Sequence, residues 1–226
     1  MRIVLSIGGS ILVPGEVDVG YIRELASFLV DLSSGNDVAV VSGGGRLARK
    51  YIDVARAFNS SEALCDLIGI DASRLNARLL SAAIGDAATL EPPTVFQKAR
   101  EELERGKIVV MGGTHPGHST DGVSALLAEY VGADLLINAT DVGGIFDKNP
   151  AEHADARLIE EITPNELMDL IREYPVDAGS YALIDPLAVK IIKRSSIKTI
   201  FLNGRDLKNM GEAISGEKYA GTRIGK

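Results

Sequence analysis

The sequence predicts an α/β protein built around a mostly parallel sheet. Apolar runs suited to buried strands alternate with helical patterns along most of the chain. Three such runs, at 3–7, 38–41 and 108–111, each end in a glycine-rich loop that a helical pattern follows. No linker or low-complexity stretch interrupts this alternation, so we expect a single domain over residues 1–226.

The remaining elements follow from apolar spacing, capping residues and chain breakers. Helices are expected at 18–32, 46–58, 66–85, 94–105, 120–130, 164–174, 185–195 and 206–215. Strands are expected at 37–42, 134–139 and 198–203 in addition to the first and third runs. The segment 140–157 is rich in glycine and other breakers and is predicted to be a loop.

Composition narrows the class of protein. The 226 residues are 46% apolar and 24% charged, which fits a soluble globular chain. The formal charge of −7 argues against nucleic acid or anionic lipid as partners, and no apolar run is long enough to cross a membrane. Cys65, the single cysteine, excludes an intramolecular disulfide and has the neighbours of a packed thiol. With no secretory signal in view, we expect a cytoplasmic protein.

The three loops suggest a crevice that binds phosphates. They begin at Gly8-Gly9-Ser10, Gly43-Gly44-Gly45 and Gly112-Gly113-Thr114. Glycine lets backbone N–H groups approach an anion closely, and a following helix N-terminus adds partial positive charge. The first loop lacks the GxGxxG spacing of a dinucleotide site and could by itself be an ordinary turn. Together, the three loops indicate a site for more than one phosphate.

The helix after the second loop offers cations at Arg46, Arg49 and Lys50. Their spacing places them within two helical turns of the glycines, and the preceding loop favours a binding role over the alternative of a solvated helix surface. The third loop resembles a P-loop, but His118 stands where that motif requires lysine, which argues against a P-loop NTPase. His115 and His118 lack a close third ligand, so no metal site is predicted from them.

Four longer motifs resemble the amino acid kinase superfamily, and within it the archaeal-type uridylate kinases. They are GGGRLARKY at 43–51, DLIGIDASRLNA at 66–77, GGTHPGHSTDGVSALLAE at 112–129 and IDPLAVKII at 184–192. The resemblance covers essentially the whole chain. It implies an αβα sandwich with an N-terminal half for UMP and a C-terminal half for ATP, a Mg²⁺ ion that accompanies ATP, and a homohexamer.

The resemblance also implies roles for individual residues. Contacts to UMP fall on Gly44, Asp66, Thr114, His115, Pro116, Gly117, His118, Ser119 and Thr120. Contacts to ATP fall on Gly9, Ser10, Gly45, Arg49, Thr140, Phe146 and Asn149. Asp185 matches the acid that organises the catalytic cations, and Asp121 an acid that follows the acceptor loop. Without the resemblance, both aspartates would be read as helix caps or first-turn charges.

Four positions depart from the family pattern. Phe146 stands where tyrosine is common, and Asn149 and Gly143 replace acids. Ser6 stands where many members have a lysine, so a cation near the transferred phosphoryl group must come from elsewhere. We nominate Lys190 for catalysis beside Arg49 and Asp185, with Lys50 as the alternative; Lys148 is a weaker candidate.

The sequence therefore predicts transfer of the γ-phosphoryl group of Mg·ATP to UMP. An alternative inside the same fold is another phosphate-acceptor kinase, such as an isopentenyl phosphate kinase, which would need a long apolar acceptor pocket. The acceptor stretch offers Asp66, Asp71, Arg74 and Asn76 instead. A second alternative is a non-catalytic nucleotide-binding or storage subunit, which would bind ATP without UMP-dependent release of ADP.

Overall fold

A computed structural model of the chain describes residues 1–173 and 184–225. Its sheet has the strand order β3-β2-β1-β4-β6-β7-β5, in which only the β6–β7 pair is antiparallel. The strands are β1 (Arg2–Ile7), β2 (Asp37–Ser42), β3 (Val109–Met111), β4 (Leu135–Thr140), β5 (Glu161–Ile162), β6 (Lys198–Asn203) and β7 (Thr222–Ile224). The mostly parallel sheet predicted from the alternating pattern is confirmed.

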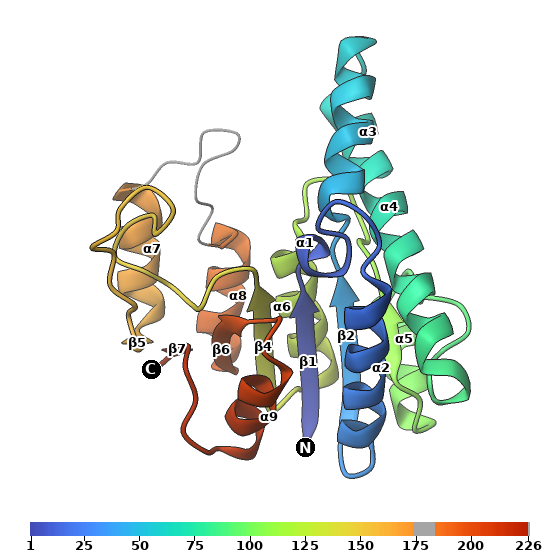
Figure 1. The fold of residues 1–226 in the computed structure, drawn as a ribbon. Coiled ribbons are helices and arrows are strands. Elements are labelled where there is room, and N and C mark those ends of the chain that lie inside the picture. Colours follow the sequence, from blue (N-terminus) through green and yellow to red (C-terminus); the bar gives the residue numbers. More distant parts are fainter. Residues whose placement is uncertain (174–183, 226) are drawn as a thin grey trace.

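Helices cover both faces of this sheet, and the predicted αβα sandwich is confirmed as well (Figure 1). The helices are α1 (Gly9–Leu12), α2 (Val19–Ser33), α3 (Gly45–Ala57), α4 (Glu62–Ile84), α5 (Phe96–Glu104), α6 (Thr120–Val131), α7 (Pro164–Glu173), α8 (Pro186–Ser195) and α9 (Leu207–Ser215), with a 3₁₀ turn at Gly85–Ala87. One core lies under α2, α9 and the C-terminal part of α4. The other lies under α5, α6, α7 and α8.

Several elements differ from expectation. Helix α4 begins at Glu62 rather than 66, because the Ser61 hydroxyl caps it by accepting from Leu64 N–H at 3.3 Å. The strands β5 and β7 and the four-residue α1 were not predicted, since they are too short to show a period. The last residue of the helix expected at 164–174 lies outside the described residues.

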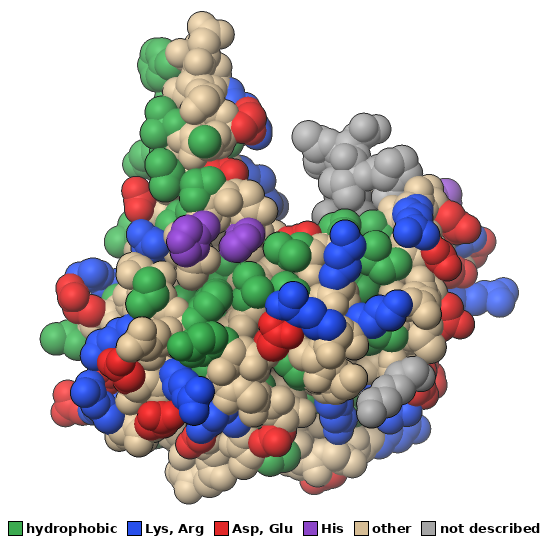
Figure 2. All heavy atoms as spheres, turned by 180° about the vertical axis from the view of Figure 1, so that it is seen from behind, with side chains coloured by type: hydrophobic (Ala, Val, Ile, Leu, Met, Phe, Trp, Pro, Cys, Tyr) green, Lys and Arg blue, Asp and Glu red, His purple; other side chains and the backbone are tan. Residues whose placement is uncertain are grey.

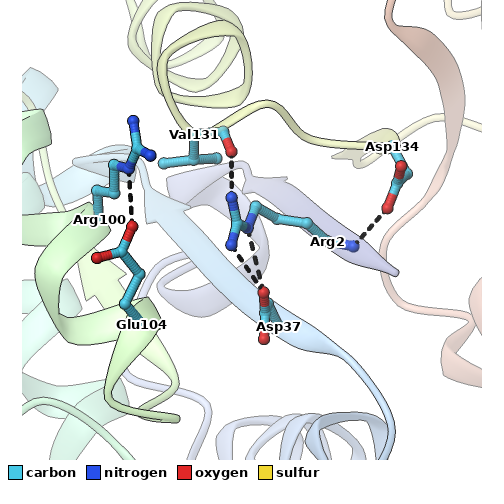
Figure 3. A network of polar contacts seen from close by, with 6 residues as sticks. All are labelled: Arg2, Asp37, Arg100, Glu104, Val131 and Asp134. Carbon is cyan, nitrogen blue, oxygen red and sulfur yellow. Dashed lines mark hydrogen bonds and ion pairs between the residues drawn. The ribbon is translucent and has the colours of Figure 1, made fainter.

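The amino-terminal edge of the sheet is held by charged groups. The Arg2 guanidinium donates to Asp37 at 3.0 Å and to the Val131 carbonyl, and the Arg2 backbone N–H donates to Asp134 at 2.7 Å (Figure 3). These bonds join β1 to β2 and to the α6–β4 connection. A cavity of about 510 Å³ at this edge is lined in part by Arg2, Asp37 and Asp134, and both aspartates already bond to Arg2.

The hairpin of α3 and the start of α4 projects beyond the carboxyl-terminal edge of the sheet (Figure 1). Apolar side chains lie along this projection (Figure 2), and Tyr51, Val54, Phe58, Leu64 and Leu67 are among its exposed residues. Within the described residues, no helix combines the length and the apolar character that a membrane span requires.

Candidate active site

The loops after β1 and β2 touch each other through their backbones. A Cβ on Gly9 would lie 2.0 Å from the Gly45 nitrogen and 2.6 Å from the Gly43 carbonyl carbon. Gly45 also has a φ of +65°, a conformation that other residues rarely adopt. Only glycine fits at these contacts, so the glycines bring the two loops together as the sequence predicted.

A cavity of about 470 Å³, called cavity A here, opens over these loops at the carboxyl ends of the strands. Parallel α/β sheets bind ligands at this edge. The predicted residues that line cavity A are Gly9, Ser10, Gly44, Gly45, Arg49, Ser119, Thr120 and Thr140. They come from the first and second loops, the start of α3, the N-terminus of α6 and the end of β4. Cavity A therefore unites residues from both halves of the chain.

A second cavity of about 190 Å³, called cavity B, adjoins the first. Its predicted lining residues are Gly44, Asp66, His115, His118, Ser119 and Thr120. Ala48 and Ile52 of α3 and Ile70 of α4 add apolar surface. Because Gly44, Ser119 and Thr120 line both cavities, the two meet where the second loop faces the N-terminus of α6.

The third loop is fixed to α4. Gly117 N–H donates to the Asp66 carboxylate at 2.8 Å, and Gly113 N–H donates to the Ser73 hydroxyl at 2.7 Å. A Cβ on Gly112 would lie 2.6 Å from the Arg74 nitrogen, so this glycine is needed for the close approach. Asp66 thus positions the loop as well as lining cavity B. Thr114, Pro116 and Gly117 do not line either cavity, and the buried Thr114 Oγ1 and His118 Nδ1 have no hydrogen-bond partner among residues 1–173 and 184–225.

Asp185 joins α8 to the N-terminus of α6. One carboxylate oxygen caps α8 by accepting from Leu187 N–H at 2.8 Å, and the other accepts from the Ser119 hydroxyl at 2.5 Å. Ser119 itself caps α6 by accepting from Gly122 N–H at 3.0 Å. Asp185 therefore caps α8 and also lies beside the predicted site.

Asp121 lies on the floor of cavity A. Its Oδ1 accepts from Asn138 Nδ2 at 2.9 Å and from the Ser6 hydroxyl at 3.4 Å. Burial raises the pKa of this carboxyl above its ordinary value of 3.8, and the nearby Asp185 charge adds to the rise, while the two hydrogen bonds oppose it. Ser6, in the place of the family's common lysine, therefore serves the carboxylate as a neutral donor.

The predicted cations divide into two groups. Arg49 reaches cavity A from the second turn of α3. Lys50 and Lys190 are exposed and line neither cavity A nor cavity B. In this conformation Arg49 is the cationic side chain on the wall of cavity A, and the lysine nominations remain predictions.

Phe146 and Asn149 lie in the long loop after β4, beyond the part that lines cavity A. Phe146 forms an antiparallel bridge with Leu158, and the Asn149 amide donates to Glu152 at 2.9 Å. The loop contributes Asp141, Val142 and Gly144 to the cavity instead. The predicted ATP contacts at Phe146 and Asn149 are thus not joined to the cavity in this structure.

Sequence reasoning missed Asn138 and Ser73. Each is a buried polar residue within an element that is otherwise largely apolar, Asn138 in β4 and Ser73 in α4. That anomaly was the available signal, because buried polar groups need partners and mark particular contacts. Within residues 1–173 and 184–225, no group of three or more His, Cys, Asp or Glu side chains is arranged to hold a metal ion.

Comparison with known proteins identifies the class to which this architecture belongs. The model of the amino acid kinase family matches residues 1–203, and the chain belongs to that family. Over 224 residues it is 49% identical to the uridylate kinase of Methanobrevibacter smithii, with 99% of each chain covered. It is 50% identical over 217 residues to that of Methanothermobacter thermautotrophicus, with 96% of each covered.

Two solved structures share the fold of this chain. The crystal structure of uridylate kinase from Archaeoglobus fulgidus superimposes with a TM-score of 0.90 at 43% identity over 100% of both chains. UMP kinase from Ureaplasma parvum has a TM-score of 0.82 at 21% identity, over 100% of this chain and 99% of the other, a likeness of fold alone. The predicted family and fold are confirmed.

Proposed function

We propose that the protein is a uridylate kinase that transfers the γ-phosphoryl group of ATP to the 5′-phosphate of UMP. The observation that carries this proposal is the junction of cavities A and B at Gly44, Ser119 and Thr120. Donor and acceptor phosphates could meet at that junction. The full-length similarity to proteins named uridylate kinase supports UMP as the acceptor.

Assignment of the cavities follows from their linings. Cavity A, with the first two glycine loops and the N-terminus of α3, suits the phosphates of ATP. Cavity B, with the Asp66 carboxylate and the apolar Ile52 and Ile70, suits a ribose and a base. The ATP phosphates then lie against the first two glycine loops, while the family resemblance implies that the rest of ATP binds mainly to the C-terminal half of the chain and UMP to the N-terminal half.

The chemical difficulty is repulsion between two phosphates. Two unit charges about 4 Å apart repel by roughly 1 kcal/mol in water and roughly 4 kcal/mol at an effective dielectric of 20. A phosphate oxygen is already a competent nucleophile, so positioning and charge neutralisation carry the catalysis. Loop N–H groups and Arg49 would supply both, and Asp185 holds Ser119 at the meeting point.

A Mg²⁺ ion bound to ATP fits the residues present. Mg²⁺ in kinases is held by one or two carboxylates together with substrate phosphates, and it neutralises charge on the transferring group. Asp121 and Asp141 line cavity A and are the carboxylates available to it there.

We further infer a homo-oligomer, a hexamer by family resemblance, in the cytoplasm. The exposed apolar side chains of the α3–α4 hairpin support contact with a second copy, since contiguous apolar patches on a surface mark interfaces. This contact would cover the helix that carries Arg49.

A coupled assay of ADP release with a panel of acceptors tests the proposed function. We expect release to depend on UMP, with CMP, dUMP and isopentenyl phosphate much poorer. Preference for isopentenyl phosphate would favour the other kinase, against which the Asp66 carboxylate in cavity B argues. ATP binding without release of ADP for any acceptor would favour the storage subunit.

A further inference from the structure

Helix α4 carries two buried polar side chains where it passes behind the glycine loops. Ser73 and Asn76 are each 4% exposed. They are three residues apart, so they share one face of the helix, about 4.5 Å apart along its axis. Neither lines cavity A, and only Ser73 borders cavity B. Asn76 bonds to the second glycine loop, and Ser73 bonds to the third glycine loop as well as to its own helix.

Asn76 fixes the second glycine loop. Its amide nitrogen donates to the Gly43 carbonyl at 2.9 Å and to the Gly44 carbonyl at 3.3 Å. In a trans peptide the N–H points opposite to the C=O. Holding these two carbonyls toward α4 therefore turns the N–H groups of Gly44 and Gly45 away from it. Those residues line cavity A, and N–H groups at the start of a helix such as α3 have no partner within that helix.

Ser73 fixes the third glycine loop from the same face. Its hydroxyl donates to the Ile70 carbonyl at 2.6 Å and accepts from Gly113 N–H at 2.7 Å. The neighbouring Arg74 donates to the Gly113 carbonyl at 3.1 Å. Both peptide groups of Gly113 are therefore tied to α4.

A single helix thus holds the loop at the junction of the two cavities and the loop that borders cavity B. The spacing of Ser73 and Asn76 on α4 is set by the helix itself, so the separation of the two loops follows from it. Phosphoryl transfer requires reacting atoms about 3–3.5 Å apart, and a misplacement of about 1 Å can cost roughly 100-fold in rate. The geometry of α4 therefore sets the distance between the two loops, and with it the distance between the two substrates.

We propose that Asn76, together with Ser73, is a positioning residue that sets the distance and orientation between the two nucleotides while touching neither phosphate. The inference rests on the proposed function, because the distance matters only if both nucleotides bind at once. Its signature is loss of turnover in the ternary complex while each nucleotide still binds normally alone.

The test compares Ser73→Ala with Ser81→Ala, and Asn76→Asp with the native enzyme. Ser81 is a matched control because it lies on the same helix, is also 4% exposed, and its hydroxyl has no hydrogen-bond partner in the described part of the chain. Asn76→Asp keeps the side-chain shape but places a carboxylate oxygen where the donor stood. We would measure kcat and both KM values, the Kd of UMP alone and of an ATP analogue alone, and the melting temperature.

We expect kcat to fall about 10-fold in Ser73→Ala and about 100-fold in Asn76→Asp, with each separate Kd changed less than about threefold. Ser81→Ala should keep its kcat. A lowered melting temperature with native kcat would show a purely structural role and overturn the inference. A parallel loss of either separate affinity would overturn it too, because the residues would then shape single sites.

Two further outcomes of these experiments also have a defined meaning. If Asn76→Asp does not fold, Ser73→Ala against Ser81→Ala decides by the same criteria. If the native enzyme itself releases no ADP with UMP, the proposed function fails, which the native control reveals independently of any variant. Native activity with unaffected Ser73→Ala and Asn76→Asp variants would instead reject the positioning role alone.

Discussion

At the floor of cavity A, Asp121 is held where its charge is unfavourable, since burial raises its pKa above 3.8. Below that value the carboxyl is neutral in the folded and the unfolded chain. As pH rises further, the unfolded chain loses the proton first, so folding stability falls until the folded carboxyl has ionised too. The folded state keeps an acid that costs it stability, a common feature of functional sites.

Asp121→Asn should therefore stabilise the fold at neutral pH and reduce activity. The amide oxygen can still accept from Asn138 and Ser6, so the hydrogen bonds survive while the charge does not. A gain of 1 kcal/mol would appear as a rise of about 2–4 °C in melting temperature. Melting curves from pH 4 to pH 8 check this: the difference between variant and native protein should grow with pH. A variant less stable than native at neutral pH would refute the interpretation.

Arg49 is the second residue whose role can be tested alone. Arg49→Ala should lower kcat/KM by about 100-fold or more, because it removes a cation from the wall of cavity A. Arg56→Ala is the control, since Arg56 lies on the same helix but pairs with Glu62 at 2.7 Å. Steady-state kinetics on both variants distinguish the two arginines. Equal, small losses would mean that Arg49 is only a surface charge.

The residues of the candidate site differ in how well the sequence predicts them. Gly9, Gly45 and Arg49 follow directly from strand–loop–helix spacing, and the structure brings them to one cavity. Ser6 and Asn138 do not, because their significance depends on register: they lie opposite each other on β1 and β4, and both donate to Asp121. Pairing of strands far apart in the chain is not readable from either strand alone.

Among the elements, α8 shows how one residue can serve stability and chemistry separately. Asp185→Asn should keep the cap of α8, since asparagine caps as well as aspartate, while kcat falls because the charge beside Ser119 is lost. Asp206→Ala is the contrasting variant: Asp206 caps α9 through Asn209 N–H at 2.9 Å, away from both cavities. It should lose about 1 kcal/mol of stability and keep its activity.

Calorimetry and kinetics on these two variants check the separation. If both variants were equally destabilised and lost activity only through unfolding, Asp185 would act only as a helix cap.

Among the helices and strands, the sequence predicts long elements well and short ones poorly. Helices α2 and α6 carry apolar spacing and side-chain caps, whereas β5 and β7 have two and three residues and form only because the sheet edge offers partners.

For the whole molecule, the exposed apolar hairpin predicts self-association. Val54→Glu on α3 should lower the molecular mass measured by light scattering, because a charge would be buried between copies. Val19→Glu on α2 is the matched control: Val19 is 61% exposed and Val54 56%, and only Val54 lies on the hairpin. An unchanged mass for Val54→Glu would remove the hairpin as the contact.

The overall architecture was predictable because alternating strands and helices permit few topologies, and three glycine loops locate the site at one edge. The placement of the lysines was not predictable. Lys190 was nominated because Ser6 replaces the family's lysine, yet its side chain is exposed and lines neither cavity. Sequence distance along a helix does not say which of its faces looks toward the ligand.

The most direct test of the account is a crystal structure with UMP and a non-hydrolysable ATP analogue bound together. The account predicts the triphosphate in cavity A between the first two glycine loops, UMP in cavity B, and their phosphates facing each other beside Gly44 and Thr120. Two nucleotides bound far apart, or one nucleotide occupying both cavities, would contradict it.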